Sequence, residues 1–444
     1  MDSIRLEISP EVHFTCQQCG DCCRGLMVPL LPEEKARLEG IDWGEISPRL
    51  AGKILFVENP GPSLESSPRF RLAKLGVGCA FLEEDGRCLI HERLGYEAKP
   101  LICRLFPLVL VETPSEVVAS ASFACRSVAA GEGTPLAQQR EWIESMRADP
   151  LWDAVRADGV RVSGLISTPD RIVLTADIGL DIWSYEALER AIIEILEENS
   201  HTMAVRLLAV HRLVDGAVAQ YGRGDKAAAP FANWLQHMMW SDSGVEWLYQ
   251  QPLGKVPSFG RQRSALAPLI ALVEASVATE RGDGLMRGVL GQAVGLARGR
   301  GRVSLPSLAT EIDLEAMPRV SFDQDSPRLR PMMLRYLCEW LRRKGLLAQP
   351  TVRKGVQYLL AYFALVRWYA VALAVAGGRT EVGPEELREG IRTVEKCYVH
   401  HNLLPRLLAS RPAAFSLVNL LMDLVSSPAD LVTGFYGRSA VQGA

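Results

Sequence analysis

Four of the chain's ten cysteines stand within eight positions near the N-terminus. The stretch reads FTCQQCGDCCRG and contains Cys16, Cys19, Cys22 and Cys23. So dense a set of thiols admits three interpretations: a disulfide framework, a reactive redox pair or a metal site. The choice among them constrains both the fold of this region and its chemistry.

The other cysteines are distributed unevenly along the 444-residue chain. Four more lie upstream of residue 126, namely Cys79, Cys88, Cys103 and Cys125. Only Cys338 and Cys397 lie farther on, each alone in an expected helix, and we interpret them as small buried apolar side chains. The N-terminal third therefore has a chemical task of its own.

The spacing of the first four thiols favours a metal. Cys16 and Cys19 form a CxxC pair, and Gly20 after them permits the positive φ that such turns need. The N-terminus has no apolar signal-peptide core, which predicts a cytoplasmic location where stable disulfides are rare. A redox CxxC is disfavoured because no βαβ unit surrounds it. Four thiolates suit zinc and an iron–sulfur cluster alike.

All eight N-terminal cysteines are candidate metal ligands. The set is Cys16, Cys19, Cys22, Cys23, Cys79, Cys88, Cys103 and Cys125. Eight thiols suffice for two four-coordinate sites, or for one cluster with spare ligands, and the spacing leaves both open. Adjacent side chains are expected to point apart, so at most one of the neighbours Cys22 and Cys23 should bind the ion held by the CxxC pair.

Three of these cysteines are followed directly by arginine. A zinc ion or an oxidised [4Fe–4S] core bound by four thiolates carries a net charge of about −2. Arg24, Arg104 and Arg126 are therefore candidates to offset that charge or to clamp an anionic cofactor, and ordinary solvated arginine is the equal alternative. His13 and His91 lie near cysteines and are either substitute ligands or surface side chains.

The pattern along the chain predicts an α+β fold class in two main parts. We expect a small cysteine-rich metal-binding α+β domain over residues 1–130, a transitional segment over 131–183, and a larger, mostly α-helical domain over 184–444. Within the first domain, Cys79–His91 and Leu108–Ser122 are predicted to be hairpins, each with a turn between two apolar runs.

One segment has the length and composition of a membrane span. Val356–Ala376 is apolar except for Arg367. Because a central charge in a lone span is costly, we predict a buried helix of the helical domain and no membrane association. The net charge of −3 also predicts no nucleic-acid partner, and no glycine-rich nucleotide fingerprint is found.

Two separated motifs carry a family resemblance. FTCQQCGDCCRG and GCAFLEEDGRCLIHERLGYEAKPLICRLFPL together resemble the YkgJ-type cysteine-cluster domain, the CxxCxxCC family of zinc- or iron-chelating domains. The resemblance covers about residues 12–126 and implies zinc or iron binding. One departure is the insertion LGYEAKPLI before Cys103, which bears on how that thiol is placed.

A second resemblance concerns the whole architecture. A cysteine cluster followed by a long helical region is similar to the flagellin lysine N-methylases, and LRYLCEWLRRKGLL with YLLAYFALVRWYAV resembles the paired helices of their C-terminal region. This resemblance implies an iron–sulfur cluster, S-adenosylmethionine and a protein substrate methylated on lysine. Two alternatives stay open: a zinc-stabilised binding module without catalysis, and a thiol redox or metal-transfer protein. No catalytic residue follows from either resemblance.

Overall fold

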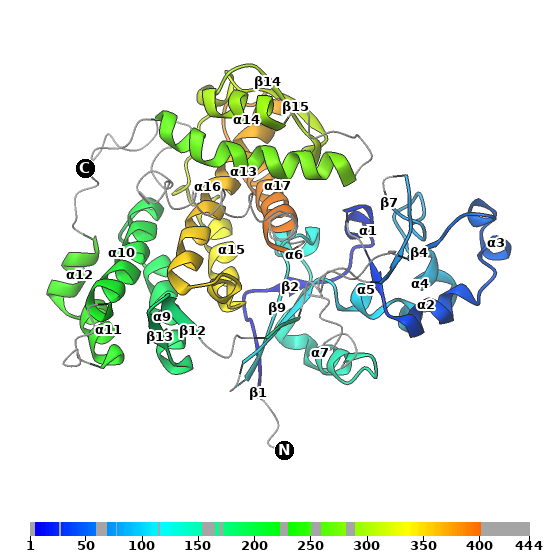
Figure 1. Ribbon diagram of the computed structural model, residues 1–444, viewed down its shortest axis with the longest axis horizontal. Coiled ribbons are helices and arrows are strands. Elements are labelled where there is room, and N and C mark those ends of the chain that lie inside the picture. Colours follow the sequence, from blue (N-terminus) through cyan, green and yellow to red (C-terminus); the bar gives the residue numbers. More distant parts are fainter. Residues whose placement is uncertain are drawn as a thin grey trace. The chain divides into compact units, whose positions relative to one another are not determined.

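The structure is a computed structural model of the chain. It describes residues 5–25, 28–58, 69–76, 78–113, 116–152, 165–167, 172–222, 230–249, 259–280 and 289–400. The chain divides into two compact units, Met1–Ser167 and Thr168–Ala444. Figure 1 colours the first unit blue to cyan and the second green to orange.

The first unit is a mixed α/β region built from small sheets and short helices. Its described strands are β1 (Arg5–Ile8), β2 (His13–Phe14), β3 (Pro29–Leu30), β4 (Phe56–Glu58), β5 (Phe70–Leu72), β6 (Lys74–Leu75), β7 (Gly78–Cys79), β8 (Leu108–Glu112), β9 (Glu116–Ala121), β10 (Thr134–Pro135) and β11 (Leu165–Ser167). Its described α-helices are α1 (Asp21–Gly25), α2 (Pro32–Glu39), α3 (Trp43–Ile46), α4 (Leu89–Leu94), α5 (Leu101–Leu105), α6 (Arg126–Ala130) and α7 (Arg140–Arg147).

The largest sheet of this unit has the strand order β1-β9-β8-β11. β8 and β9 are antiparallel neighbours, with Leu108 opposite Ala121, which confirms the hairpin predicted over Leu108–Ser122. β1 adds to β9 and β11 adds to β8, both in parallel. The apolar run Leu108–Val111 is fully buried, as expected of a strand that lies inside a sheet.

The other predicted hairpin, over Cys79–His91, is wrong in its second half. A turn does form at Gly86, whose N–H donates to Glu83 O at 3.0 Å. The ladder then consists of one bridge between Leu82 and Cys88, and the chain enters α4 directly afterwards. The first two residues of α4, Leu89 and Ile90, are both buried in the apolar core of this unit.

The second unit is mostly helical. Its described helices are α9 (Ile182–Glu197), α10 (Met203–Tyr221), α11 (Phe231–Trp240), α12 (Asp242–Tyr249), α13 (Phe259–Glu280), α14 (Val289–Arg298), α15 (Arg330–Arg342), α16 (Val352–Ala376), α17 (Pro384–Val394) and a π-helix (Glu395–His400). Its described strands form two hairpins, β12 (Ile172–Thr175) with β13 (Ile178–Leu180) and β14 (Arg302–Leu305) with β15 (Thr310–Asp313). The predicted order, a mixed α/β cysteine-rich region followed by a mostly helical one, is confirmed.

Helix α16 is the central element of the second unit. It packs against α17, α10, β12 and β15 (Figure 1). It is the one helix among the described residues that is long and apolar enough to cross a bilayer, and 83% of its most apolar window is buried inside the protein. The predicted burial is thus confirmed, and Arg367 lies over the rings of Phe322 and Phe363. The absence of a membrane partner stays a prediction.

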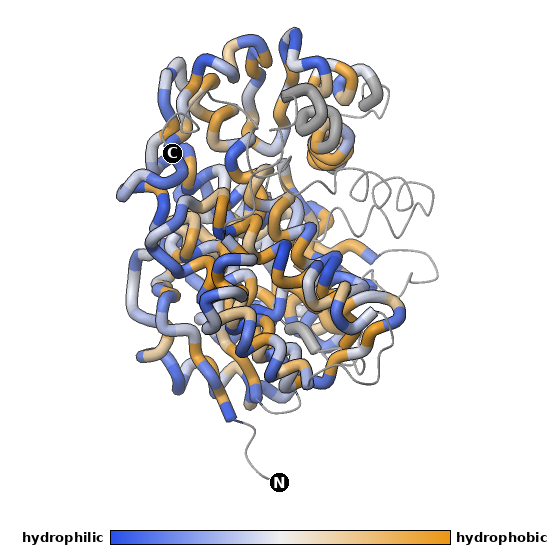
Figure 2. Tube along the Cα trace, turned by 90° about the vertical axis from the view of Figure 1, so that its left-hand side faces the viewer, coloured by the Kyte–Doolittle hydropathy of each residue, from blue (hydrophilic) through white to orange (hydrophobic). Residues whose placement is uncertain are grey.

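Hydropathy follows the same division between interior and surface. Figure 2 shows apolar stretches along the helical segments and hydrophilic residues at many of the outer turns. In the first unit, a separate apolar core gathers Leu38, Trp43, Phe81 and Leu89. Cys79 belongs to this core, so the cysteine-rich segments are attached to packed structure.

Candidate metal centre

The CxxC turn has the backbone conformation of a tight knuckle. Gln18 and Gly20 have φ values of 53° and 70°, both in the left-handed region. The chain then enters the short helix α1, where Arg24 N–H donates to Gly20 O at 3.0 Å. Arg24 also donates through Nη1 to Cys19 O at 2.8 Å. The turn therefore presents Cys19 and Cys22 from two ends of one compact loop.

This turn lies directly against the loop between Cys79 and Cys88. The Cα of Gly86 is 3.1 Å from where a Cβ on Gly20 would lie, and a Cβ on Gly86 would be 2.9 Å from Gln18 O. No side chain fits between two backbones at this separation. The two glycines thus allow the second pair of thiols to approach the first.

Arg49 holds the loop that connects Cys79 to Cys88. Its guanidinium donates to Ala80 O at 2.9 Å and Leu82 O at 3.0 Å, and pairs with Glu83 at 2.9 Å. Carbonyl groups in such a turn would otherwise have no strand partner. The guanidinium of Arg49 thus supplies hydrogen bonds that backbone N–H groups of a second strand would have supplied in the predicted hairpin.

A different set of contacts brings Cys125 to the same region. β2 pairs with β10, which follows α6 in the chain. Thr15 N–H donates to Ser127 Oγ at 3.3 Å, and Gln17 Nε2 donates to Glu132 at 2.6 Å. Because Cys125 occupies the position directly before α6, these contacts fasten the segment that carries Cys16 beside it.

Cys103 is placed by a buried carboxylate. Glu34 accepts from Leu31 N–H at 3.0 Å and from Leu101 N–H at 2.6 Å, and so joins the starts of α2 and α5. Burial raises the pKa of Glu34, and the two backbone donors oppose that rise. The segment inserted before Cys103 begins at the last residue of α4, Leu94, and continues through a short 3₁₀ turn (Tyr96–Ala98) to the start of α5.

Burial and mutual repulsion both act on these thiols. Burial raises the pKa of Cys103 well above its usual value, and charges on Cys79 and Cys88 raise it further. Burial likewise raises the pKa of Cys79 to about 12. Ionised sulfurs in this apolar setting therefore need a nearby cation.

Burial and repulsion between thiolates also act on the remaining cysteines. Burial raises the pKa of Cys125 to about 11, and charges on Cys22 and Cys19 add to that rise. Cys16 is exposed, Cys79 is buried and the other predicted ligands are half-buried. The structure thus gathers cysteines from four separate segments into one neighbourhood, which we call the cysteine cluster. Its members are Cys16, Cys19, Cys22, Cys23, Cys79, Cys88, Cys103 and Cys125.

Cys22 and Cys23 approach each other more closely than expected. Their Sγ atoms are 3.9 Å apart, so the expectation that adjacent side chains point apart is wrong. The hydrogen bond between them lowers the pKa of Cys22 to about 7 and raises that of Cys23. Two sulfurs on one tetrahedral zinc lie about 3.8 Å apart, given a Zn–S distance of about 2.3 Å. That at most one of them binds the ion of the CxxC pair stays a prediction.

The donor set fits zinc or iron by its chemistry. Soft thiolates are the preferred ligands of zinc and of iron–sulfur clusters. Among the described residues, however, no three His, Cys, Asp or Glu side chains are arranged as a ready-made metal site. The fold therefore brings the ligands into one region and does not close them around a single point.

The three predicted arginines occupy different settings. Arg24 is bound to Cys19 O, as described above. Arg104 is buried and pairs with Glu97 at 2.8 Å and Asp149 at 2.6 Å. Arg126 is exposed at the first position of α6. A cofactor-binding role for these side chains stays a prediction.

The sequence interpretation missed Lys99, a half-buried cation whose pKa responds to charges on the cluster thiols. Burial lowers its pKa, but charges on Cys103, Cys88 and Cys16 outweigh that effect, and the net shift is upward. Lys99 stands four residues before Cys103, at the entry to α5. The backbone of Lys99 is extended and α5 begins only at Leu101, so helical spacing does not relate Lys99 to Cys103, and no sequence signal marked this lysine.

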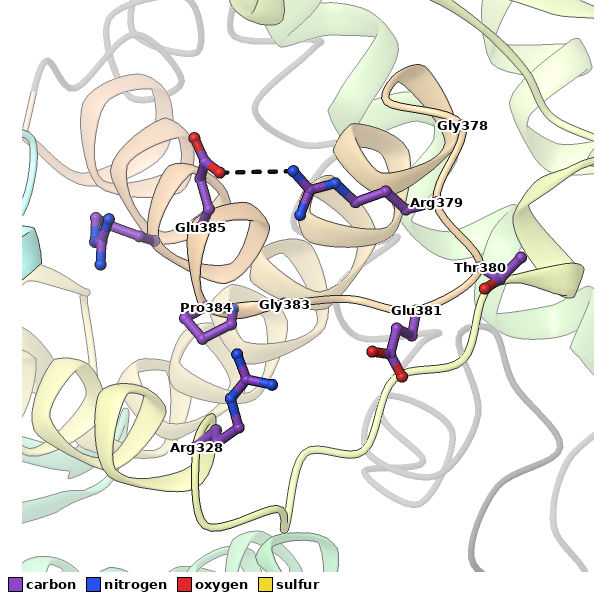
Figure 3. Close-up of a pocket in the computed structure, with 9 residues that line it drawn as sticks. Arg328, Gly378, Arg379, Thr380, Glu381, Gly383, Pro384 and Glu385 are labelled. Carbon is purple, nitrogen blue, oxygen red and sulfur yellow. Dashed lines mark ion pairs between the residues drawn. The ribbon is translucent and has the colours of Figure 1, made fainter.

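A pocket of about 650 Å³ lies elsewhere, in the second unit. Figure 3 shows Arg379 paired with Glu385 at the start of α17, with Arg328 beside Pro384. None of the eight cysteines or the three predicted arginines lines it. Because Arg379 also pairs with Glu386 at 3.0 Å, the pocket combines opposite charges and has no set of convergent ligands.

Comparison with known proteins identifies the first unit alone. A family model named CxxCxxCC and described as "Putative zinc- or iron-chelating domain" matches residues 15–126. No curated protein and no solved structure matches the chain. The matched range contains all eight clustered cysteines, both separated motifs and the contacts at Gly86 and Glu34. Residues 15–126 are a CxxCxxCC domain, a cysteine-cluster domain of the zinc- or iron-chelating type.

Proposed function

We propose that the cysteine cluster binds iron through its thiolates and holds an iron–sulfur cluster. The observation that carries the proposal is the convergence of the cysteine-bearing segments. The turn at Gly20 contacts the loop at Gly86, Thr15 bonds to Ser127 beside Cys125, and one apolar core takes in Cys23, Cys79, Cys88 and Cys103. A mononuclear zinc would need four sulfurs about 3.8 Å apart around one point. A [4Fe–4S] core is larger and accepts thiolates from a wider ring, which suits the spread of these ligands.

A mononuclear zinc site is the second candidate. It is favoured by the 3.9 Å separation of Cys22 and Cys23, which equals the sulfur spacing of a tetrahedral ion within a few tenths of an ångström. In that case the metal stabilises the first unit without doing chemistry, and its binding free energy adds to the free energy of unfolding.

Anaerobic purification with metal and sulfide analysis separates the two. For an iron–sulfur protein we expect a brown preparation with about four iron and four sulfide per chain. Colourless protein containing zinc and no sulfide would overturn the iron–sulfur proposal and support the second candidate.

A matched pair of variants tests which thiols matter. Cys79→Ala should abolish metal retention, whereas Cys338→Ala, at a thiol on α15 that is also buried, should retain the full amount. Both substitutions remove one buried sulfur, so their packing costs are similar. Equal metal content in both variants would contradict a ligand role for Cys79.

The wider architecture supports a more specific proposal, methylation of a protein lysine with S-adenosylmethionine. Its support is the resemblance of the α15 and α16 sequences to the flagellin lysine N-methylases. The iron-loaded chain should then bind S-adenosylmethionine in isothermal titration, and should add a methyl group to a lysine of a protein substrate in mass spectrometry. If no heat of binding is detected at millimolar S-adenosylmethionine, the methylation proposal is contradicted. The proposal that the cysteine cluster binds metal is not affected by that result.

A further inference from the structure

The pocket of the second unit offers no ligand set to a metal, but its backbone holds charged side chains in fixed places. It is lined by residues of the turn before α15, of the segment that leads into α17, and of α17 itself. Ser321 N–H donates to Thr380 O at 2.9 Å, and Val382 N–H donates back to Ser321 O at 3.0 Å. These bonds join the segment that leads into α15 to the segment that leads into α17, so both walls of the cavity belong to one piece of structure.

The protein itself neutralises one of the arginines that line this pocket. Arg379 pairs with Glu386 at 3.0 Å and lies 3.7 Å from Glu385 (Figure 3). Glu386 is buried and also accepts from Gly383 N–H at 2.9 Å. Gly383 permits this approach, because a Cβ there would lie 3.0 Å from the Glu386 carboxylate. Arg379 is therefore held against the start of α17, and its charge is already balanced.

Three other charged side chains of the pocket have no such partner. Among the described residues, Arg328, Glu381 and Arg388 make no ion pair, and Arg328 and Glu381 do not pair with each other. The Nε of Arg388 is buried and has no hydrogen-bond acceptor within the described protein. Buried donors in folded proteins normally have an acceptor, which here has to come from outside the chain. The cavity therefore presents two cations and one anion that the described protein leaves unpaired.

This combination of charges suits a ligand that carries both signs. An arginine binds a carboxylate or a phosphate through two parallel hydrogen bonds. A simple anion in the cavity would be repelled by Glu381, whereas a ligand that also has an ammonium group would be attracted to it. A few polar groups at opposite ends of a small molecule also fix its orientation in a cavity.

We propose that this pocket is a binding site for a small zwitterion, a molecule that joins an ammonium group to a carboxylate or a phosphate. Arg328 and Arg388 bind the oxyanion, and Glu381 binds the ammonium group. Arg379 lines the wall and stays paired with its own carboxylates. The site belongs to the second unit and contains no cysteine, so this inference does not rest on the proposed function.

The test titrates the full chain with simple probes and follows binding by saturation-transfer difference NMR. γ-Aminobutyrate carries a carboxylate and 2-aminoethyl phosphate carries a phosphate, so the two zwitterions distinguish the oxyanions. Butyrate and butylamine each lack one of the two charges. The variants are Arg328→Gln and Glu381→Gln, with Arg319→Gln as the matched control, since Arg319 is an exposed arginine that does not line the pocket. Thermal unfolding followed by circular dichroism checks that each variant is folded.

We expect at least one zwitterion to bind, and butyrate and butylamine to bind at least about tenfold more weakly, as for the loss of a hydrogen bond between charged groups. Arg328→Gln should weaken the zwitterion by a similar factor, and Arg319→Gln should match the parent. Glu381→Gln should weaken γ-aminobutyrate and strengthen butyrate, because the same carboxylate attracts an ammonium group and repels a carboxylate. A merely structural effect of this substitution would change both affinities in one direction.

Three results would overturn the inference. The first is the absence of saturable binding of either zwitterion up to about 10 mM. The second is equal affinity for γ-aminobutyrate and butyrate, which would show that the ammonium group has no role. The third is an equal effect of Arg328→Gln and Arg319→Gln, which would place any binding outside the pocket. None of these outcomes depends on the metal content of the chain, so they leave the proposed function to its own test.

Discussion

Single residues decide how closely the thiol-bearing segments approach. Gly20 and Gly86 face each other across a gap that has no room for a Cβ on either side. Gly20 was identified from its place after the CxxC pair. Gly86 was expected only as the turn residue of a hairpin, and its contact with Gln18 O is a property of the folded chain.

A pair of alanine substitutions tests this close approach. Gly86 and Gly95 have nearly equal φ values, 90° and 89°, but nothing lies within 4 Å of a Cβ at Gly95. Gly95 has φ 89° and ψ 169°, a region that is essentially restricted to glycine, so Gly95→Ala should cost about 1–3 kcal/mol from backbone strain alone. Gly86→Ala should cost about 1–3 kcal/mol more, from the clash with Gln18 O, and should lower metal content.

Urea unfolding and metal analysis of both variants check that prediction. The comparison sets a position with a close backbone contact against one without, at nearly equal φ. Equal unfolding midpoints and equal metal content in the two variants would contradict a role for the close contact between Gly86 and Gln18 O.

At the scale of elements, a buried ion pair joins α9 to the turn after α15. Lys344 Nζ lies 2.6 Å from Glu189 Oε2, both side chains are about 6–7% exposed, and Tyr185 donates to the other carboxylate oxygen at 2.6 Å. Burial raises the pKa of Glu189, and Lys344 opposes that rise. Such pairs are costly to break because one charge stays behind in the interior.

The substitution Lys344→Met should therefore destabilise the second unit in a pH-dependent manner. Without the lysine, the pKa of Glu189 rises further, so the folded state holds a proton that the unfolded state releases. The stability of the variant should be greatest below the unfolded pKa of the carboxyl and should fall as pH rises through the folded pKa. Breaking the pair should cost about 3–5 kcal/mol at pH 8.

Urea unfolding at pH 5 and pH 8 measures this dependence. The double variant Glu189→Gln/Lys344→Met removes both charges and should lose the extra pH dependence. A single variant whose loss of stability is the same at both pH values would contradict the assignment of the effect to Glu189.

Some helices and strands could be predicted from their sequence patterns alone. The hairpin of β8 and β9 was predicted because two apolar runs flank a turn, and helix α9 because its apolar residues recur at helical spacing. The segment after Cys88 was mistaken for a strand, because six residues are too few for either period to emerge. Its helical form depends on packing Leu89 and Ile90 into a core made by distant segments.

At the scale of the whole molecule, each compact unit has its own interior. We expect metal removal to act on the first unit, since the clustered cysteines all lie there. Hydrogen exchange with and without a chelator should show lost protection in α1, α4 and α5, with unchanged protection in α16 and α17. Lost protection in α16 as well would mean that the metal stabilises both units together.

The sequence by itself determined that eight thiols belong to the N-terminal third, that their spacing suits metal ligands, and that a mostly helical region follows. Residue identity and local periodicity are enough for those conclusions. Only the tertiary structure decided that Cys22 and Cys23 lie 3.9 Å apart and that Arg104 is engaged by two carboxylates. These contacts join segments far apart in the chain, and their energies depend on burial and on facing charges, which are properties of the folded chain and are absent from local sequence.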